Sequence, residues 1–205
     1  MSEERAIKML REFFAEGIDM TSAEATLWFR DNLSSIGYIR PSNIIEKSGG
    51  SPARLAPGRM YYYGYRPKGE ATLPFYDRFP LTLVLQREVG GFLGLNFHYL
   101  HPNDRANFFN NISRFINDPE YDQNSDARIA VTYQALKTAK TTGSAKKGRA
   151  LEFYKACTKR YYYSNIVTKV VDVPPVYWKF MLFLPIDRFS NILREEAWKK
   201  SRRMI

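Results

Sequence analysis

The chain has 205 residues, of which 44% are hydrophobic and 15% aromatic, and it carries a formal net charge of +10 with an isoelectric point of about 9.6. This length and hydrophobic content allow one domain with a real core and exclude a disordered chain. The excess of positive charge favours a polyanionic partner, such as nucleic acid, an anionic membrane or an acidic protein surface. A solvated basic surface with no specific partner is the alternative.

The N-terminal residues predict a pair of helices followed by an arm. Apolar residues at helical spacing predict a helix from Glu3 to Phe14, and a second helix follows Ser22 and stops before Gly37. The segment Pro41–Gly58 is rich in Gly, Pro and Ser and predicts a loop or an extended arm. A loop of this length is unusual unless it binds something, although an ordinary exposed linker has the same composition.

The middle of the chain predicts a small β-structure. The sequence MYYYGY at Met60–Tyr65 is typical of a strand. Two further apolar strands, Leu81–Gln86 and Phe92–Leu100, flank Gly90 and Gly91, which suit a primed-type hairpin turn.

A helical insertion is predicted after this hairpin, over about residues 102–160. Helical periodicity covers Phe108–Ile116 and Asp126–Lys140, and Arg149–Cys157 predicts a short further helix. Between the last two lies Lys140–Gly148, KTTGSAKKG, which we interpret as a basic and flexible tip.

The C-terminal part predicts two more strands and a helix. Ile166–Val173 is β-branched and strand-like, and Pro174 and Pro175 stop it. Met181–Leu184 predicts a last buried strand, and Phe189–Ile205 a terminal helix.

These elements predict an α+β fold, in which a small antiparallel β-sheet or SH3-like β-barrel is decorated by N-terminal, central and C-terminal helices. Residues 1–58 would form the helical pair and the arm, and residues 59–205 the α+β core domain with its central insertion. Whether the sheet closes into a barrel stays open at this point.

Catalytic and metal-binding patterns are weak. His98 and His101 are the only histidines, and together with Asp104 they have a spacing that suits a metal. They straddle a predicted strand end and helix start, however, so they need not converge. Cys157 is the only cysteine, so an intrachain disulfide is impossible, and it has no local signature of a nucleophile.

The sequence YDRFP is interpreted as a structural corner before a strand, made by Tyr76, Asp77, Arg78 and Pro80. Asp77 and Glu88 could form a pair of catalytic carboxylates. The simpler interpretation is that Asp77 pairs with Arg78 or caps backbone amides. We therefore expect no metal, no cofactor and no enzymatic activity.

The basic clusters are the stronger signal. Cations neutralise phosphates, and the neighbouring Tyr161–Tyr163 could stack on exposed bases. Alternatively, these tyrosines are strand residues half in the core, and the lysines meet solvent or an acidic partner subunit. The candidate contact residues for nucleic acid or an acidic partner are Lys137, Lys140, Lys146, Lys147, Arg149, Lys155, Lys159, Arg160, Lys199, Lys200, Arg202 and Arg203.

Several segments together resemble a known family. MYYYGYRPK, LPFYDRFPL, GFLGLNFHYL, CTKRYYYSNI, PPVYWKFMLFLPIDRF and SRRMI follow one another in this order, as they do in the DNA end protector proteins of T-even-like contractile-tailed phages (myoviruses). The resemblance covers most of the chain from Arg59 onward, and it transfers no catalytic residue.

The resemblance implies a virion protein, made in the host bacterial cytoplasm, that shields a DNA terminus near the head–tail neck from host exonuclease. Its partners would be other virion proteins of the neck, tail or baseplate and double-stranded DNA ends, but no membrane. One alternative is a tail or baseplate structural subunit that makes only protein contacts. Another is a nuclease, against which the lack of a carboxylate and histidine cluster argues. Position in the particle, copy number and symmetry stay open.

The sequence also carries expectations about location. The charged start, MSEERAIKML, is not followed by an apolar run and so does not resemble a signal peptide. The apolar stretch Phe180–Pro185 is too short to cross a bilayer. We therefore expect a soluble protein that is made inside the cell.

Overall fold

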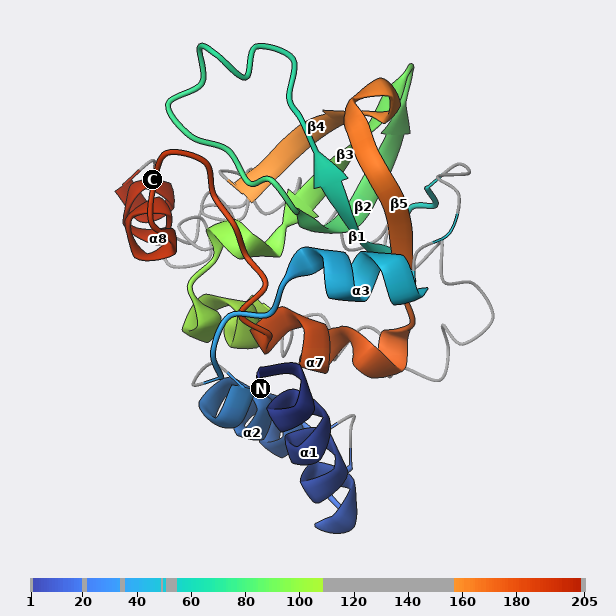
Figure 1. Cartoon of the computed structure of the whole chain (residues 1–205), viewed down its shortest axis with the longest axis vertical. Helices are drawn as coiled ribbons and strands as arrows, with labels where there is room; N and C mark the ends of the chain where they lie inside the picture. The colour runs from blue at the N-terminus through green and yellow to red at the C-terminus, as the bar shows by residue number, and fades with distance from the viewer. Residues whose placement is uncertain are drawn as a thin grey trace, which may run out of the picture.

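The computed structural model describes residues 2–19, 22–33, 36–48, 50, 55–108 and 157–203. A five-stranded antiparallel sheet occupies one half of the molecule, and helices cover one of its faces (Figure 1). The strands lie in the order β4-β3-β2-β1-β5. The α+β prediction is therefore confirmed, whereas the sheet is open and the SH3-like barrel is not confirmed.

The elements have the following bounds. The strands are β1 (Met60–Tyr65), β2 (Leu81–Glu88), β3 (Gly91–Asn96), β4 (Thr158–Tyr162) and β5 (Ile166–Val173). The described α-helices include α1 (Ser2–Ala15), α2 (Ala23–Leu33), α3 (Pro41–Ser48), α7 (Trp178–Phe183) and α8 (Arg194–Arg203), and short 3-10 turns are η1 (Phe97–Tyr99), η3 (Tyr163–Asn165) and η4 (Pro175–Tyr177).

The predicted N-terminal helical pair is confirmed as α1 and α2. Gly17 has a φ of 69°, as expected where a glycine ends a helix. The hydroxyl of Ser22 accepts the backbone N–H of Ala25 at 3.0 Å and so caps α2. The rings of Phe13 and Phe29 lie 4.5 Å apart and join the two helices. Helix α2 also packs against α7, so the pair is attached to the rest of the fold.

The prediction of a loop or extended arm over Pro41–Gly58 was wrong in its first half, because Pro41–Ser48 is helix α3. A proline is favoured in the first turn of a helix, where its missing N–H is not needed. Helix α3 packs on β5 (Figure 1). After it, Gly50 exchanges two backbone hydrogen bonds with Val170, of 2.9 and 3.1 Å.

Strand β1 is buried along its whole length because both of its faces are covered. On one face, Met60 and Tyr62 belong to the main core with the helices. On the other, Tyr61, Tyr63 and Tyr65 form a second, aromatic-rich core. The tyrosine-rich strand predicted from the sequence is therefore confirmed, and it packs on both sides.

The β2–β3 hairpin is confirmed, but its turn differs from the prediction. Glu88 pairs with Gly91, so the turn residues are Val89 and Gly90. Gly90 has a φ of 73° while Val89 has no positive φ, and a primed turn requires a positive φ at its first position. Gly91 is instead needed because a Cβ there would lie 1.9 Å from the carbonyl oxygen of Tyr161 on β4.

Three further boundaries differ from the predictions. The strand predicted to end at Leu100 ends at Asn96, and η1 follows it. The last buried strand predicted at Met181–Leu184 was wrong, since this segment belongs mainly to helix α7. The terminal helix begins at Arg194 rather than Phe189.

The predicted insertion is described only at its two ends. Residues 102–108 are helical, as predicted. The other predicted helices and the basic tip at 140–148 lie almost entirely outside the described residues. Residues 158–160 belong to β4, so the end of the predicted insertion is part of the sheet.

Candidate nucleic-acid interface

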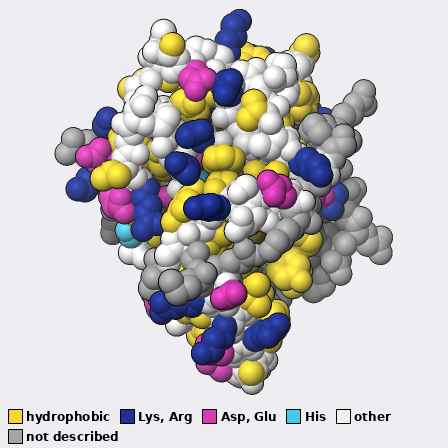
Figure 2. Space-filling model, viewed as in Figure 1, with side chains coloured by type: hydrophobic (Ala, Val, Ile, Leu, Met, Phe, Trp, Pro, Cys, Tyr) yellow, Lys and Arg dark blue, Asp and Glu magenta, His cyan; other side chains and the backbone are white. Residues whose placement is uncertain are grey.

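The predicted basic residues fall into three groups. Lys137, Lys140, Lys146, Lys147, Arg149 and Lys155 lie outside the described residues. Lys159 and Arg160 are on the edge strand β4, and Lys199 and Lys200 are on helix α8. Arg202 and Arg203 form the last turn of α8, and their side chains are not described. On the face shown in Figure 2, lysine and arginine side chains lie among hydrophobic patches.

A groove of about 290 Å³ lies between β4 and the connection from β1 to β2, residues 66–80. Figure 1 shows this connection as the long loop that arches above the sheet. Aromatic rings and cations dominate the groove. Its lining residues are Tyr65, Pro67, Lys68, Leu73, Phe75, Tyr76, Asp77, Tyr99, Lys159, Arg160, Tyr161 and Tyr162.

Three cations lie over aromatic rings of this groove. The ammonium of Lys159 lies 5.2 Å from the ring centroid of Tyr99, and the guanidinium of Arg160 lies 5.1 Å from that of Tyr162. The ammonium of Lys200, from α8, lies 5.2 Å from the ring centroid of Phe75. Such contacts are attractive because the face of an aromatic ring is negative. The fold therefore brings cations from two distant predicted clusters to one place.

Helix α8 is held in this position by contacts with His98 in η1 and with His101 shortly after it. The indole N–H of Trp198 donates to the carbonyl oxygen of His98 at 2.8 Å. Ala197 is fully buried, and the ring of Trp198 also packs on His101. These contacts hold Lys200 next to the groove wall.

Lys159 and Arg160 differ in their electrostatic surroundings. The guanidinium of Arg160 forms an ion pair of 2.7 Å with Glu88. No carboxylate among the described residues lies within ion-pair distance of Lys159. Burial lowers the pKa of the Lys159 ammonium, while nearby Cys157 acts in the opposite direction. A partly desolvated cation without a carboxylate partner is a favourable place for an anion.

The tyrosines beside Arg160 are not equivalent. Tyr161 is 4% exposed, and its ring stacks on Phe92 with centroids 5.4 Å apart. Its hydroxyl accepts a hydrogen bond of 3.1 Å from the side chain of Asn96. Tyr162 and Tyr163 are only partly buried. Stacking on a base is therefore limited to the second and third tyrosines, because the first is a core residue.

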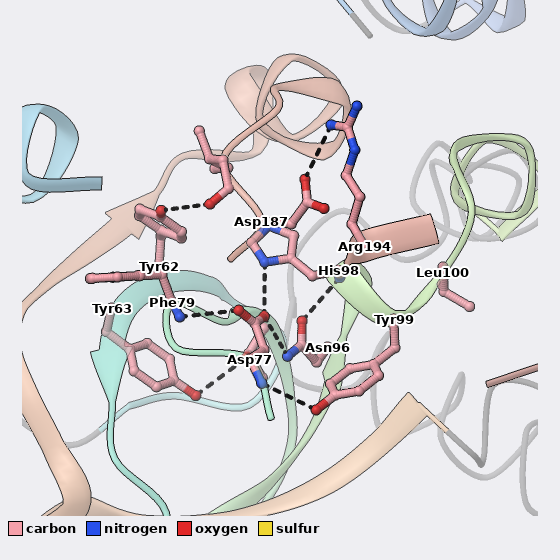
Figure 3. Close-up of polar contacts among 12 residues, drawn as sticks. Tyr62, Tyr63, Asp77, Phe79, Asn96, His98, Tyr99, Leu100, Asp187 and Arg194 are labelled. Carbon is pink, nitrogen blue, oxygen red and sulfur yellow. Dashed lines mark hydrogen bonds and ion pairs between the residues drawn. The ribbon is translucent and has the colours of Figure 1, made fainter. Parts of the chain in front are cut away.

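The corner residue Asp77 is at the centre of a buried polar cluster (Figure 3). One carboxylate oxygen accepts from the amide of Asn96 at 2.9 Å and lies 2.8 Å from Nδ1 of His98. The other accepts the backbone N–H of Phe79 at 3.1 Å. Asp77 is 3% exposed and His98 is fully buried. The carboxylate thus caps a backbone amide, as one interpretation of the sequence had it, but its neighbouring ring is that of His98, and no ion pair joins it to Arg78.

The other corner residues shape the groove. The hydroxyl of Tyr76 donates to Glu70 at 2.6 Å and closes the loop on itself. The backbone of Arg78 donates to Arg188 at 2.8 Å and accepts from Tyr65 at 2.9 Å, while its side chain is exposed. Pro80 is buried directly before β2. The corner therefore holds the loop 66–80 in place across from β4.

The remaining candidates for chemistry are engaged elsewhere. Nδ1 of His101 accepts the backbone N–H of Asn103 at 3.2 Å. Burial raises the pKa of the Cys157 thiol to about 12, which keeps it protonated. Within the described ranges, no three His, Cys, Asp or Glu side chains are placed to hold a metal ion. Nor does any helix in that part of the chain have the length and apolar character to cross a membrane.

Sequence reasoning missed the loop side of the groove. Lys68, Leu73 and Phe75 were not singled out, and neither was Tyr99 on η1. Leu73 and Phe75 are large apolar residues in an otherwise polar loop, and this pattern could have identified them. In the structure Leu73 is 38% exposed and Phe75 is only partly buried. Apolar side chains left accessible in a polar loop indicate a contact surface.

The fold and the groove define a basic α+β protein in which cations lie on the aromatic rings of one groove, a combination typical of proteins that bind nucleic acids. A family model described as the phage T4 terminal DNA protecting protein matches residues 7–201, and the chain belongs to this family. The resemblance seen in the sequence is thereby confirmed. No curated protein and no solved structure matches the chain.

Proposed function

We propose that this chain is a non-enzymatic virion protein of a contractile-tailed phage that binds the ends of double-stranded DNA and blocks access to them. The observation that carries this proposal is the family match over residues 7–201. The net charge of +10 supports it, because a cationic protein gains binding free energy by releasing counterions from DNA. The protein would be made in the host cytoplasm and incorporated into the particle, where its partners are DNA ends and other virion proteins.

Protection would be steric. An exonuclease must reach the terminal nucleotide, and a bound protein that covers the terminus denies it access. Contacts to phosphates carry no sequence information, so the same protein can cover any end. A non-enzymatic role agrees with the surroundings of Asp77 and His98, which are both buried and bonded to each other.

The test is a titration of the purified protein with linear duplex DNA at several salt concentrations. We expect the logarithm of the association constant to fall linearly with the logarithm of the salt concentration, by about 0.9 for each phosphate contacted. The same mixtures with and without divalent cations should show intact DNA. Absence of binding at low salt, or robust cleavage, would contradict the proposal.

A second candidate function is a tail or baseplate subunit that makes only protein contacts. Apolar side chains on the N-terminal helices favour it: Phe14 is 52% exposed, Ile7 45% and Leu27 43%. Exposed apolar residues of this size suit a protein interface. Failure to bind DNA in the titration above, together with assembly into particles, would favour this function.

A further inference from the structure

The groove between β4 and the loop 66–80 has the size of a small-molecule site rather than of a duplex surface. Its volume of about 290 Å³ lies near the lower end of the roughly 300–1,000 Å³ typical of ligand pockets. A double helix cannot enter such a space. One nucleotide can, provided that its base has left the helix.

The groove offers both kinds of contact that a nucleotide needs. Phe75 on the loop and Tyr162 on β4 line the groove and are only partly buried, so each side chain can contact a base that enters it. Each of these rings has a cation next to it, Lys200 and Arg160 respectively. Bases stack on aromatic rings regardless of their sequence, and neighbouring cations bind the phosphates that link them.

Lys159 is the cation best placed to hold a phosphate. Arg160, the other cation of β4 in the groove, already pairs with Glu88, and the carboxylate of Asp77 is engaged by three donors. Lys159 packs on Tyr99 and has no carboxylate partner among the described residues. An incoming phosphate oxygen would supply the missing counter-charge where water is partly excluded, and charge-assisted hydrogen bonds are stronger there.

Geometry also distinguishes a DNA end from the interior of a duplex. A base inside the helix is stacked on both sides and paired, so removing it requires much unstacking and unpairing energy. A terminal base is stacked on one side only, and that energy is smaller. A pocket that accepts one displaced base therefore selects ends over interior sites.

We propose that this groove holds the terminal nucleotide of a DNA strand, with Lys159 on its phosphate and the ring of Tyr162 on its base. This inference rests on the proposed function, since it explains how a protein that binds DNA would prefer its ends. It assigns end preference to the groove, and general affinity to the basic surface around it.

The test compares one duplex in two forms, linear with open ends and closed at both ends by hairpin loops. We expect the wild-type chain to prefer the open form. Lys159→Gln should reduce this preference on the order of tenfold, the effect of one lost charge-assisted hydrogen bond. Lys169→Gln is the matched control, because Lys169 is exposed on β5, the opposite edge of the sheet. It should leave the preference unchanged.

Tyr162→Leu is the second variant, since it removes the ring while β4 keeps its backbone hydrogen bonds. It should also lower the preference, and thermal unfolding of both variants checks that they fold. Equal binding of the wild-type chain to open and closed DNA, or an unchanged preference in a folded variant, would overturn the inference while DNA binding itself persists. If the wild-type chain binds neither the open nor the closed DNA, the proposed function is overturned, and the inference with it.

Discussion

Two polar regions lie side by side in this molecule, the buried cluster around Asp77 and the groove around Lys159. Asp77 also lines the groove, so the two regions adjoin. In the cluster, His98 lies 2.8 Å from the carboxylate and is fully buried. In the groove, Lys159 lies over a ring and no described carboxylate neutralises it.

Residue types alone therefore do not identify a site. An aspartate next to a histidine suggests catalysis, yet here the pair is enclosed and its carboxylate also holds Phe79 and Asn96. A lysine on a strand does not by itself indicate a binding site, yet the surroundings of Lys159 favour the binding of an anion. Burial and the presence of a partner separate a structural charge from a binding charge.

The largest expected effect is on stability, and it follows from removing the carboxylate of Asp77 from the buried cluster. Asp77→Ala removes the acceptor of three donors and leaves them buried without a partner. We expect the free energy of unfolding to fall by about 3–5 kcal/mol. Urea denaturation measures it. Asp172→Asn is the control: its ion pair with Arg59 is largely exposed, so the loss should stay below about 1 kcal/mol. Equal losses would refute the structural role of the cluster.

A smaller effect is expected where β4 meets β3. Gly91→Ala would place a Cβ 1.9 Å from the carbonyl oxygen of Tyr161. The strands must shift apart, and we expect a loss of about 1–3 kcal/mol together with weaker end binding, because Lys159 moves with β4. Gly50→Ala is the matched control, since a Cβ there meets nothing within 4 Å. A variant that keeps full stability would show that the two strands are not so close.

The groove should also respond to pH through Lys159. Burial lowers the pKa of its ammonium below the ordinary 10.5, so as the pH rises this cation loses its charge before exposed lysines do. Preference for DNA ends should therefore fall at a lower pH than general DNA affinity. Lys159→Arg keeps its charge and should shift the fall to higher pH. Binding titrations over alkaline pH measure this, and a parallel decline of both affinities would speak against it.

The smallest effect is expected from the cation on α8. Lys200→Gln removes one exposed charge beside Phe75. We expect a modest loss of affinity and a decrease of about 0.9 in the salt-dependence slope, if this ammonium contacts one phosphate. The stability of the fold should not change. An unchanged slope in a salt titration would place Lys200 outside the DNA interface.

Much of the fold could be predicted from the sequence, because local patterns determine it. The period of apolar residues predicted α1 and α2, and the tyrosine-rich sequence MYYYGY predicted β1. The segment Met181–Leu184 was mistaken for a strand because a short apolar run has no period that separates a buried strand from a buried helix. Helix α7 is buried on nearly all sides, so no polar face marks it.

The site was less predictable because it depends on contacts between distant segments. Charge counting found Lys159 and Lys200, but it could not show that both lie on rings of one groove. The loop that supplies Phe75 and the strand that supplies Lys159 are far apart in the sequence, and the fold alone brings them together. The burial of Tyr161 could not be predicted either, because a run of three tyrosines does not indicate which ring lies in the core.

The central claim is that the chain shields DNA ends through its groove, and exonuclease protection tests it most directly. Linear duplex DNA is incubated with a processive exonuclease and saturating protein, and the fraction of full-length DNA is followed over time. We expect the wild-type chain and Lys169→Gln to preserve the DNA, and Lys159→Gln at the same concentration to protect it poorly. Degradation at the rate of naked DNA in the presence of the wild-type chain would contradict the account.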